Sequence, residues 1–179
     1  MSATSLILAA AVAVGEDSAA ENRAPDFVVP IAHSVGLMTV MRTTEAVIWP
    51  DPFARTEYFG ARYEEAFTKP PIYPDGDAWY VNYVGHAFFG SELYLRARTC
   101  HFGWAGSLAF AAAGSTLWEY AFEGNGVRPS LQDLVYTPLA GAALGELRYF
   151  AWRSLPTKSP ARFIFDPLGE LERTIGTDC

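Results

Sequence analysis

The side chains best suited to chemistry in this sequence are one histidine and several carboxylates at helical spacing. Asn82 and His86 lie four residues apart, as do Glu119 and Glu123, and Ser115 precedes Glu119 by the same step. Residues at positions i and i+4 lie on one face of an α-helix. A histidine beside two or three carboxylates can act as a general base with an orienting acid, or it can ligate a divalent metal.

Whether these side chains meet depends on three apolar segments, which cover residues 78–98, 104–123 and 130–153. Short turns separate the segments, and helices joined by short turns pack as antiparallel neighbours. An up-down-up path then places the start of the first segment, the end of the second and the start of the third in one layer. Asp133 joins the cluster in this layer, and Arg128 can reach over it from the turn before the third segment.

The predicted cluster has two interpretations. In the first, it is a set of hydrogen bonds that joins the helices, because buried polar groups need partners whether or not they catalyse a reaction. In the second, His86 is a general base, and Glu119 and Glu123 orient it or bind a metal with it. Asp133 is also explained as the capping partner of Ser130.

The common catalytic and cofactor motifs are missing from the sequence. It has no GxSxG nucleophile, P-loop, HExxH helix or Rossmann glycine pattern. Its three histidines are too few for a histidine-rich metal site, and His33 and His101 are expected to face solvent. We therefore assign no metal and no cofactor from the sequence.

The composition indicates a single domain with few charges. The chain has 179 residues, of which 50% are hydrophobic and 18% are charged, whereas about a quarter are charged in a typical soluble domain. The net charge is −7 and the basic residues form no stripe with aromatic residues, which excludes a nucleic-acid partner. Cys100 and Cys179 form no known pair motif and are interpreted as incidental.

The chain divides into three parts. Residues 1–30 contain an apolar stretch from Leu6 to Val14 that is typical of a signal peptide, followed by an acidic leader. Residues 31–155 form one helical domain, and residues 156–179 form a basic loop with a short helix. The signal-like segment predicts export.

The predicted fold class is mostly α, an antiparallel helical bundle with an up-down-up three-helix core. A helix over 31–48 and an aromatic, amphipathic helix over 53–68 precede the core. Asp166 and Pro167 stand at the cap and first-turn positions that begin the short C-terminal helix.

The sequence leaves open whether this bundle is embedded in a membrane. Segment 104–123 has about the 20 residues that a spanning helix needs, with charges only at Glu119 and Glu123. The cations at the ends of the first and third segments fit the positive-inside rule, but cations also favour helix C-termini. These cations are Arg96, Arg98, Arg148, Arg153, Lys158 and Arg162. Charged residues inside the first and third segments argue against a span.

A series of motifs runs through the domain: Asn82 to Ser91, Ala97-Arg98, Ser115 to Tyr120, Glu123, Pro129 to Asp133, Thr137-Pro138, Gly141 and Leu144 to Glu146. Their order resembles a family of Gram-negative cell-envelope proteins that share a domain of unknown function, over roughly residues 31–155. The resemblance implies an envelope location and no established activity. Ala87 replaces a proline of the family pattern and Phe89 a second histidine, which weakens a metal hypothesis for this chain.

A fainter similarity is to VanZ-like membrane proteins. It rests on a histidine helix followed by Glu119, Arg128, Asp133, Gly141 and Gly145. This resemblance implies an integral-membrane helical bundle.

The function that the sequence favours is a structural or accessory role in the cell envelope, in or on a membrane. One alternative is a hydrolase or transferase that acts on a lipid or other apolar envelope substrate through His86, Glu119 and Glu123. Another is a carrier of an apolar ligand. Membrane lipid and other envelope proteins are the expected partners.

Overall fold

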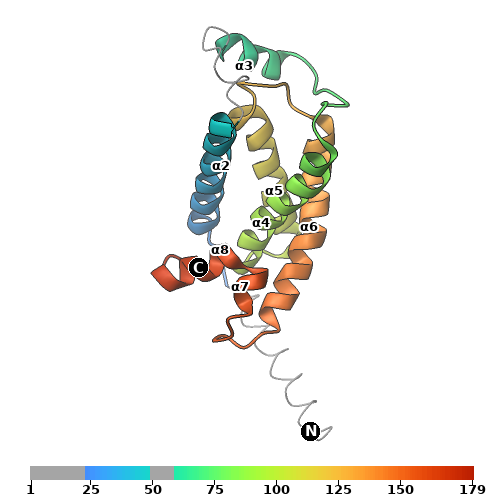
Figure 1. Ribbon diagram of the computed structural model, residues 1–179. Coiled ribbons are helices and arrows are strands. Elements are labelled where there is room, and N and C mark those ends of the chain that lie inside the picture. The colour runs from blue at the N-terminus through green and yellow to red at the C-terminus, as the bar shows by residue number, and fades with distance from the viewer. Residues whose placement is uncertain (1–22, 49–58) are drawn as a thin grey trace, which may run out of the picture.

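The computed structural model describes residues 23–48 and 59–179, and this part of the chain is helical without a β-strand (Figure 1). Its elements are α2 (Val28–Ile48), α3 (Phe59–Thr68), η2 (Val81–Gly85), α4 (His86–Thr99), α5 (Trp104–Leu117), η3 (Trp118–Phe122), α6 (Leu131–Arg153), α7 (Arg162–Phe165) and α8 (Pro167–Ile175). The prediction of a mostly helical bundle is confirmed.

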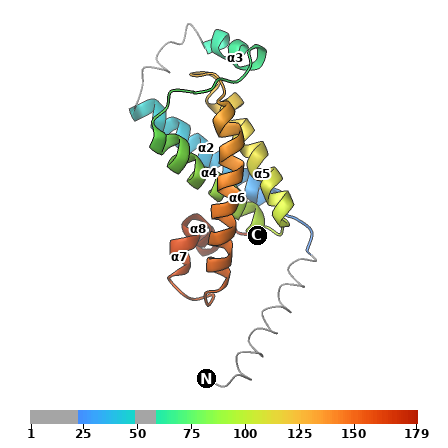
Figure 2. The ribbon, with the colours of Figure 1, turned by 90° about the vertical axis from the view of Figure 1, so that its right-hand side faces the viewer.

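Helices α4, α5 and α6 form the predicted up-down-up core, in which each packs against the other two. α2 lies beside α4, while α3 crosses one end of the bundle and α7 and α8 pack at the other end (Figure 1). Figure 2 shows α6 crossing in front of the other core helices. The start of α4, the end of α5 and the start of α6 therefore share the end near α3.

The boundaries of the predicted helices agree with the structure within a few residues. α2 begins at Val28 rather than at 31, and α3 covers the second half of the predicted 53–68 helix. The predicted cap of α6 is confirmed, because Ser130 Oγ accepts a hydrogen bond from the Asp133 N–H at 3.2 Å. The signal-like stretch and the first half of the 53–68 helix lie outside the described residues.

Glycines set the short distance between α4 and α6. A Cβ on Gly141 would overlap the backbone of Gly90, and a Cβ on Gly90 would overlap the carbonyl group of Thr137. A Cβ on Gly145 would lie 3.1 Å from the carbonyl oxygen of Ser91. The Gly141–Gly145 step therefore allows the two backbones to approach closely, and this approach brings Thr137 beside the first turns of α4.

The described helices do not support embedding of the bundle in a membrane. Within residues 23–48 and 59–179, none of them is both long enough and apolar enough to cross a bilayer. The predicted span 104–123 is divided into the 14 residues of α5 and the five of η3. The longer α6 carries charged side chains along its length, Asp133, Glu146, Arg148 and Arg153.

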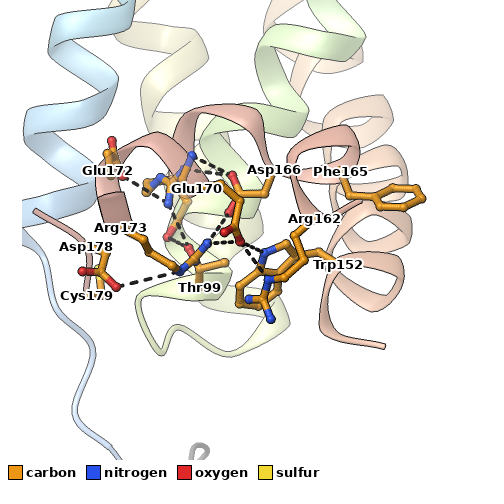
Figure 3. Close-up of polar contacts among 12 residues, drawn as sticks. Thr99, Trp152, Arg162, Phe165, Asp166, Glu170, Glu172, Arg173, Asp178 and Cys179 are labelled. Carbon is orange, nitrogen blue, oxygen red and sulfur yellow. Dashed lines mark hydrogen bonds and ion pairs between the residues drawn. The ribbon is translucent and has the colours of Figure 1, made fainter. Parts of the chain in front are cut away.

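Ion pairs join the C-terminal helices to the bundle (Figure 3). The guanidinium group of Arg96, which is 1% exposed, lies 3.0 Å from Asp166 and 3.2 Å from Glu172. His33 was expected to face solvent, but its ring contacts Glu172 and lies 3.5 Å from Glu92. Its partners come from α4 and α8, so spacing along the sequence could not reveal them.

The cysteines are not incidental. Cys100, at the end of α4, and Cys179, the last residue of the sequence, form a disulfide bond. The bond joins residues 79 positions apart, and it forms because α8 returns the chain to the end of α4. The spacing of the two cysteines carried no signal of that return.

Candidate functional site

Two short π-helical turns carry the cluster that the sequence predicted. η2 ends immediately before His86, and η3 contains Glu119. In a π turn the hydrogen bond spans five residues instead of four. Such turns are rare in proteins as a whole, but those that occur are often found at functional sites. The wider turn rotates the side chains that follow it, so it changes which of them face the neighbouring helices.

His86, Glu119 and Asp133 come from three elements and converge. Each offers one ligand atom, and the three atoms lie within 4.8 Å of one another. The three residues are 7%, 1% and 2% exposed, respectively. We call these three residues the ligand group. Nε2 of His86 is 3.7 Å from Oδ2 of Asp133, which is too long for a hydrogen bond.

Two carboxylate oxygens of the ligand group have no hydrogen-bond partner among the described residues. They are Oε1 of Glu119 and Oδ1 of Asp133, and Oδ1 of the nearly buried Asn82 also has none. Leaving a buried acceptor without a partner costs about 1–3 kcal/mol. These acceptors are therefore available to a cation.

Ser130 holds the carboxylates in place from the N-terminus of α6. Its N–H donates to Oε2 of Glu119 at 2.8 Å, and its hydroxyl donates to Oδ2 of Asp75 at 2.6 Å. The same hydroxyl accepts from the N–H of Asp133. Asp75 in turn accepts from Nδ2 of Asn82 at 2.8 Å. The cap of α6 thus also fixes the geometry of the cluster.

Thr137 orients the imidazole of His86. Nδ1 of His86 lies 2.8 Å from Oγ1 of Thr137, a distance at which Nδ1–H can donate to the hydroxyl. Nε2 then keeps its lone pair and faces Asp133. Metal-bound histidines almost always donate their other ring N–H to a hydrogen-bond acceptor, and the Thr137 hydroxyl can take that place here.

Burial and mutual repulsion raise the pKa values of both carboxyl groups in the ligand group. The pKa of Glu119 rises to about 8, mainly through burial and further through Asp133 and Asp75, although the Ser130 N–H opposes the rise. The pKa of Asp133 rises to about 7, again mainly through burial. For Asp75, hydrogen bonds from Ser130 and Asn82 help to outweigh the effect of burial, so its pKa is lowered.

The imidazole of His86 is neutral at physiological pH. Burial lowers its pKa to about 4, although Asp75 acts in the opposite direction. Among the described residues, no lysine or arginine forms an ion pair with Glu119 or Asp133. A divalent cation would compensate these carboxylates and would accept the lone pair of a neutral imidazole.

Glu123 was predicted as a member of the site, but its carboxyl group does not belong to the ligand group. It follows the π turn η3, so the four-residue step from Glu119 no longer keeps both side chains on one face. Burial, together with repulsion from Glu119 and Glu45, raises its pKa well above the usual range, and Arg42 opposes this rise. Its electrostatic neighbours therefore include two residues of α2.

The predicted supporting residues take different places. Ser115 donates to the backbone oxygen of Asp133 at 3.2 Å, so it supports the first turn of α6. Asn82 holds Asp75 beside Ser130, as described above. Arg128 donates to the carbonyl oxygen of Pro70 rather than to a carboxylate.

Asp75 and Thr137 are parts of the cluster that the sequence did not assign. Thr137 lies four residues after Asp133, and this helical step could have revealed it. Asp75 lies in the proline-rich loop before η2, where no periodicity exists. Only its contacts with Ser130 and Asn82 place it in the cluster.

The arrangement can coordinate one divalent ion through an imidazole nitrogen and two carboxylate oxygens. Imidazole ligands suit zinc, iron, nickel and copper, carboxylate ligands also suit manganese, and magnesium and calcium prefer oxygen ligands alone. A catalytic ion needs an open coordination position, whereas a structural ion is enclosed. Burial of all three residues of the ligand group favours an enclosed ion.

A family model described as a domain of unknown function, DUF3943, matches residues 71–168. The match covers more than half of the chain, and the chain therefore belongs to this family. The chain matches no curated protein and no solved structure. The matched range includes the whole ligand group and Asp75, whereas most of α8 lies outside it. The comparisons do not show the similarity to VanZ-like proteins.

Proposed function

We propose that this protein binds a divalent transition-metal ion through His86, Glu119 and Asp133, and that the ion joins α4, η3 and α6. One observation carries the proposal. Three buried ligand atoms from three elements lie within 4.8 Å of one another, and two carboxylate oxygens of this group have no hydrogen-bond partner within residues 23–48 and 59–179.

The replacement of a family histidine by Phe89 does not count against this ion. Phe89 packs against Trp118 in the apolar core, with their ring centroids 5.5 Å apart. The three atoms of the ligand group meet without a contribution from position 89. We therefore revise the assignment from the sequence, which gave these residues no metal.

The ion has a structural role in this proposal. Its ligands are buried and are held by Ser130 and Thr137, which suits an enclosed ion that stabilises the junction of three helices. A hydrolase or transferase would need a path by which its substrate reaches Nε2 of His86. The proposal thus keeps the structural or accessory role that the sequence favoured.

Metal analysis of the purified full-length protein tests the proposal. We expect about one equivalent of a transition metal in the wild type and its loss in Asp133→Asn. The matched control is Glu64→Gln, which removes an exposed carboxylate on α3 and should keep the metal. A wild-type protein that neither contains metal nor gains thermal stability from added zinc or manganese would overturn the proposal.

The cell envelope is the proposed location, with membrane lipid and other envelope proteins as partners. The disulfide between Cys100 and Cys179 supports this location, because disulfides persist in oxidising compartments such as the periplasm. Alkylation of intact cells before lysis should leave both cysteines unlabelled. Full labelling of both thiols would contradict export.

Carriage of an apolar ligand is a second candidate function, which one cavity favours. The cavity of about 370 Å³ lies between α2, α4, α6 and the C-terminal helices, and its walls include Leu37, Met41, Phe88 and Leu168. Sites for small ligands begin at about 300 Å³. Mass spectrometry of the purified protein should then detect a co-purifying lipid, and Met41→Glu should abolish it. A preparation free of lipid would exclude this candidate.

A further inference from the structure

We propose that the end of the bundle opposite the ligand group binds a phosphate ester in a cavity lined by Arg98, Arg153 and Arg162. The cavity has a volume of about 510 Å³, within the range of small-molecule sites. Its walls also include Tyr149 and Trp152. This inference does not depend on the metal ion, because no residue of the ligand group contributes to the cavity.

The charge of the lining indicates an anionic ligand. Among the described residues, the cavity is lined by three arginines and His101 and by no acidic side chain. The chain as a whole has a net charge of −7, so this concentration of basic groups runs against the overall composition. Some of the cations that fitted the positive-inside rule at the ends of the first and third apolar segments therefore line this cavity, namely Arg98, Arg153 and Arg162.

Partners orient all three guanidinium groups of the cavity, and Nη1 of Arg153 donates to the hydroxyl of Tyr149 at 3.2 Å. Arg98 donates twice to Glu146, at 3.0 Å each, and lies 4.5 Å from the centre of the Tyr149 ring. Arg162 donates to Glu170 at 2.8 Å, and its guanidinium carbon lies 4.0 Å from the centre of the Trp152 ring (Figure 3). A guanidinium group has five N–H donors. These contacts orient the groups and leave further donors for a ligand.

Oriented guanidinium groups favour phosphate among the anions. Arginine donates paired hydrogen bonds to phosphate oxygens, and several arginines can share the oxygens of one tetrahedral group. Groups that are already oriented lose less conformational entropy when a ligand binds. The cavity thus has the donor chemistry of a phosphate site.

The aromatic part of the lining indicates an ester rather than inorganic phosphate. Tyr149 and Trp152 form a stacked pair, with ring centroids 6.2 Å apart, and Leu155 and Pro156 continue this apolar wall. The organic part of a phosphate ester can pack there while the phosphate contacts the arginines. A soluble phosphate ester and a phospholipid headgroup share this chemistry.

His101 lies directly after the end of α4. Its φ angle is 70°, the left-handed conformation that commonly ends an α-helix, and the N–H of Phe102 closes this turn by donating to the carbonyl oxygen of Ala97 at 3.1 Å. His101 lines the cavity, so its imidazole adds a further hydrogen-bonding group beside the arginines.

Isothermal titration calorimetry of the metal-stripped full-length protein at low salt tests the proposal. The probes are phenyl phosphate, inorganic phosphate and phenylacetate, and sedimentation with phosphatidylglycerol or phosphatidylcholine vesicles tests the lipid source. We expect phenyl phosphate to bind more tightly than the other two soluble probes. Vesicle binding without phenyl phosphate binding would support a lipid headgroup, provided that it depends on Arg153.

Two variants and a control separate this site from general charge effects. Arg153→Gln should weaken binding about tenfold or more, because a hydrogen bond to a charged group is lost. His101→Asn removes the imidazole but tolerates a positive φ, so it tests the site if Arg153→Gln fails to fold. Arg62→Gln, a half-exposed arginine on α3, changes the charge equally and should bind as the wild type does. Absence of binding to all probes, or equal binding by these variants, would overturn the proposal.

Discussion

Replacing Glu119 by Gln separates the electrostatic cost of a buried carboxylate from the benefit of a bound ion. The side-chain oxygen of Gln can keep the hydrogen bond from the Ser130 N–H. In metal-free protein the pKa of Glu119 is about 8, against a usual value of 4.5. Between these values the folded state binds a proton that the unfolded state has released. Stability of the metal-free wild type therefore falls as pH rises from 4.5 towards 8.

The size of the effect follows from the same values. Each tenfold difference in proton affinity is worth about 1.4 kcal/mol, so Glu119 costs the metal-free wild type about 3 kcal/mol at pH 7. In a chain of this length, 1 kcal/mol shifts the melting temperature by about 2–4 °C. Glu119→Gln should therefore melt about 6–12 °C above the metal-free wild type at pH 7, and this difference should vanish near pH 4.

A bound ion reverses the order of the two proteins. Metal at one thousand times its dissociation constant stabilises the wild type by about 4.1 kcal/mol, which exceeds the cost of about 3 kcal/mol at Glu119, and leaves Glu119→Gln unchanged. Asp133 and Glu123 have raised pKa values too, so the pH slope of the wild type alone cannot isolate Glu119. The difference between the two proteins does isolate it.

Calorimetric melting of chelator-treated protein between pH 4 and pH 8, with and without zinc or manganese, measures both effects. Glu64→Gln serves as the control, because its exposed carboxylate should leave the pH profile and the metal response unchanged. If Glu119→Gln melts below the metal-free wild type at pH 7, the reasoning on the buried carboxylate is wrong. If zinc and manganese leave the melting of the wild type unchanged, the ligand group binds neither ion.

Further predictions concern the rest of the fold. Gly141→Ala should lower the free energy of unfolding in urea by more than about 2 kcal/mol, because its Cβ would overlap the backbone of α4. Gly36→Ala, with open space around its Cβ, should be neutral or stabilising. Equal effects of the two substitutions would contradict the close packing of α4 against α6. Cys179→Ser should cost about 2–5 kcal/mol and should make the melting temperature insensitive to reducing agent, unlike that of the wild type. The pKa of Glu170 is lowered because hydrogen bonds from an indole and from a guanidinium group outweigh its burial. The ionised carboxylate of Glu170 thus stabilises the fold at pH values above its unfolded-state pKa, and this stabilisation is lost in acid. Glu170→Gln should therefore flatten the fall in melting temperature below about pH 4. A fall as steep as that of the wild type would contradict this role.

Most of the fold could be predicted because its signals are local. Apolar segments of helical length, broken by short turns, gave the up-down-up core, and the cap at Ser130 marked the start of α6 within one residue. The same topology placed His86, Glu119 and Asp133 in one layer, where they converge. Antiparallel packing therefore carries the information that residues far apart in the sequence share one end of the bundle.

The remaining parts of the site depend on tertiary packing. The four-residue step of an α-helix predicted that Glu123 shares a face with Glu119. η3 is a π turn, however, and in a π turn that step no longer places two side chains on one face. No pattern of residue types marks a π turn. Asp75 lies in a loop without periodicity, and Cys179 meets Cys100 only because α8 packs back against the bundle. These features belong to the assembled fold rather than to any one segment.

Buried carboxylates have different electrostatic partners at the two ends of this bundle. At the C-terminal end, Arg96 lies against Asp166, and Arg148 lies 2.7 Å from Glu92. At the other end, Glu119 and Asp133 are just as buried, yet their neighbours are further carboxylates and a neutral imidazole.

Leaving buried carboxylates without a positive partner costs several kcal/mol, and this chain avoids that cost with arginine wherever its C-terminal helices meet the core. An arginine in the same place would join α4, η3 and α6 permanently. A diffusible cation would join them only when it is bound, and the sequence would then contain its ligands without a basic partner. That combination is what His86, Glu119 and Asp133 present.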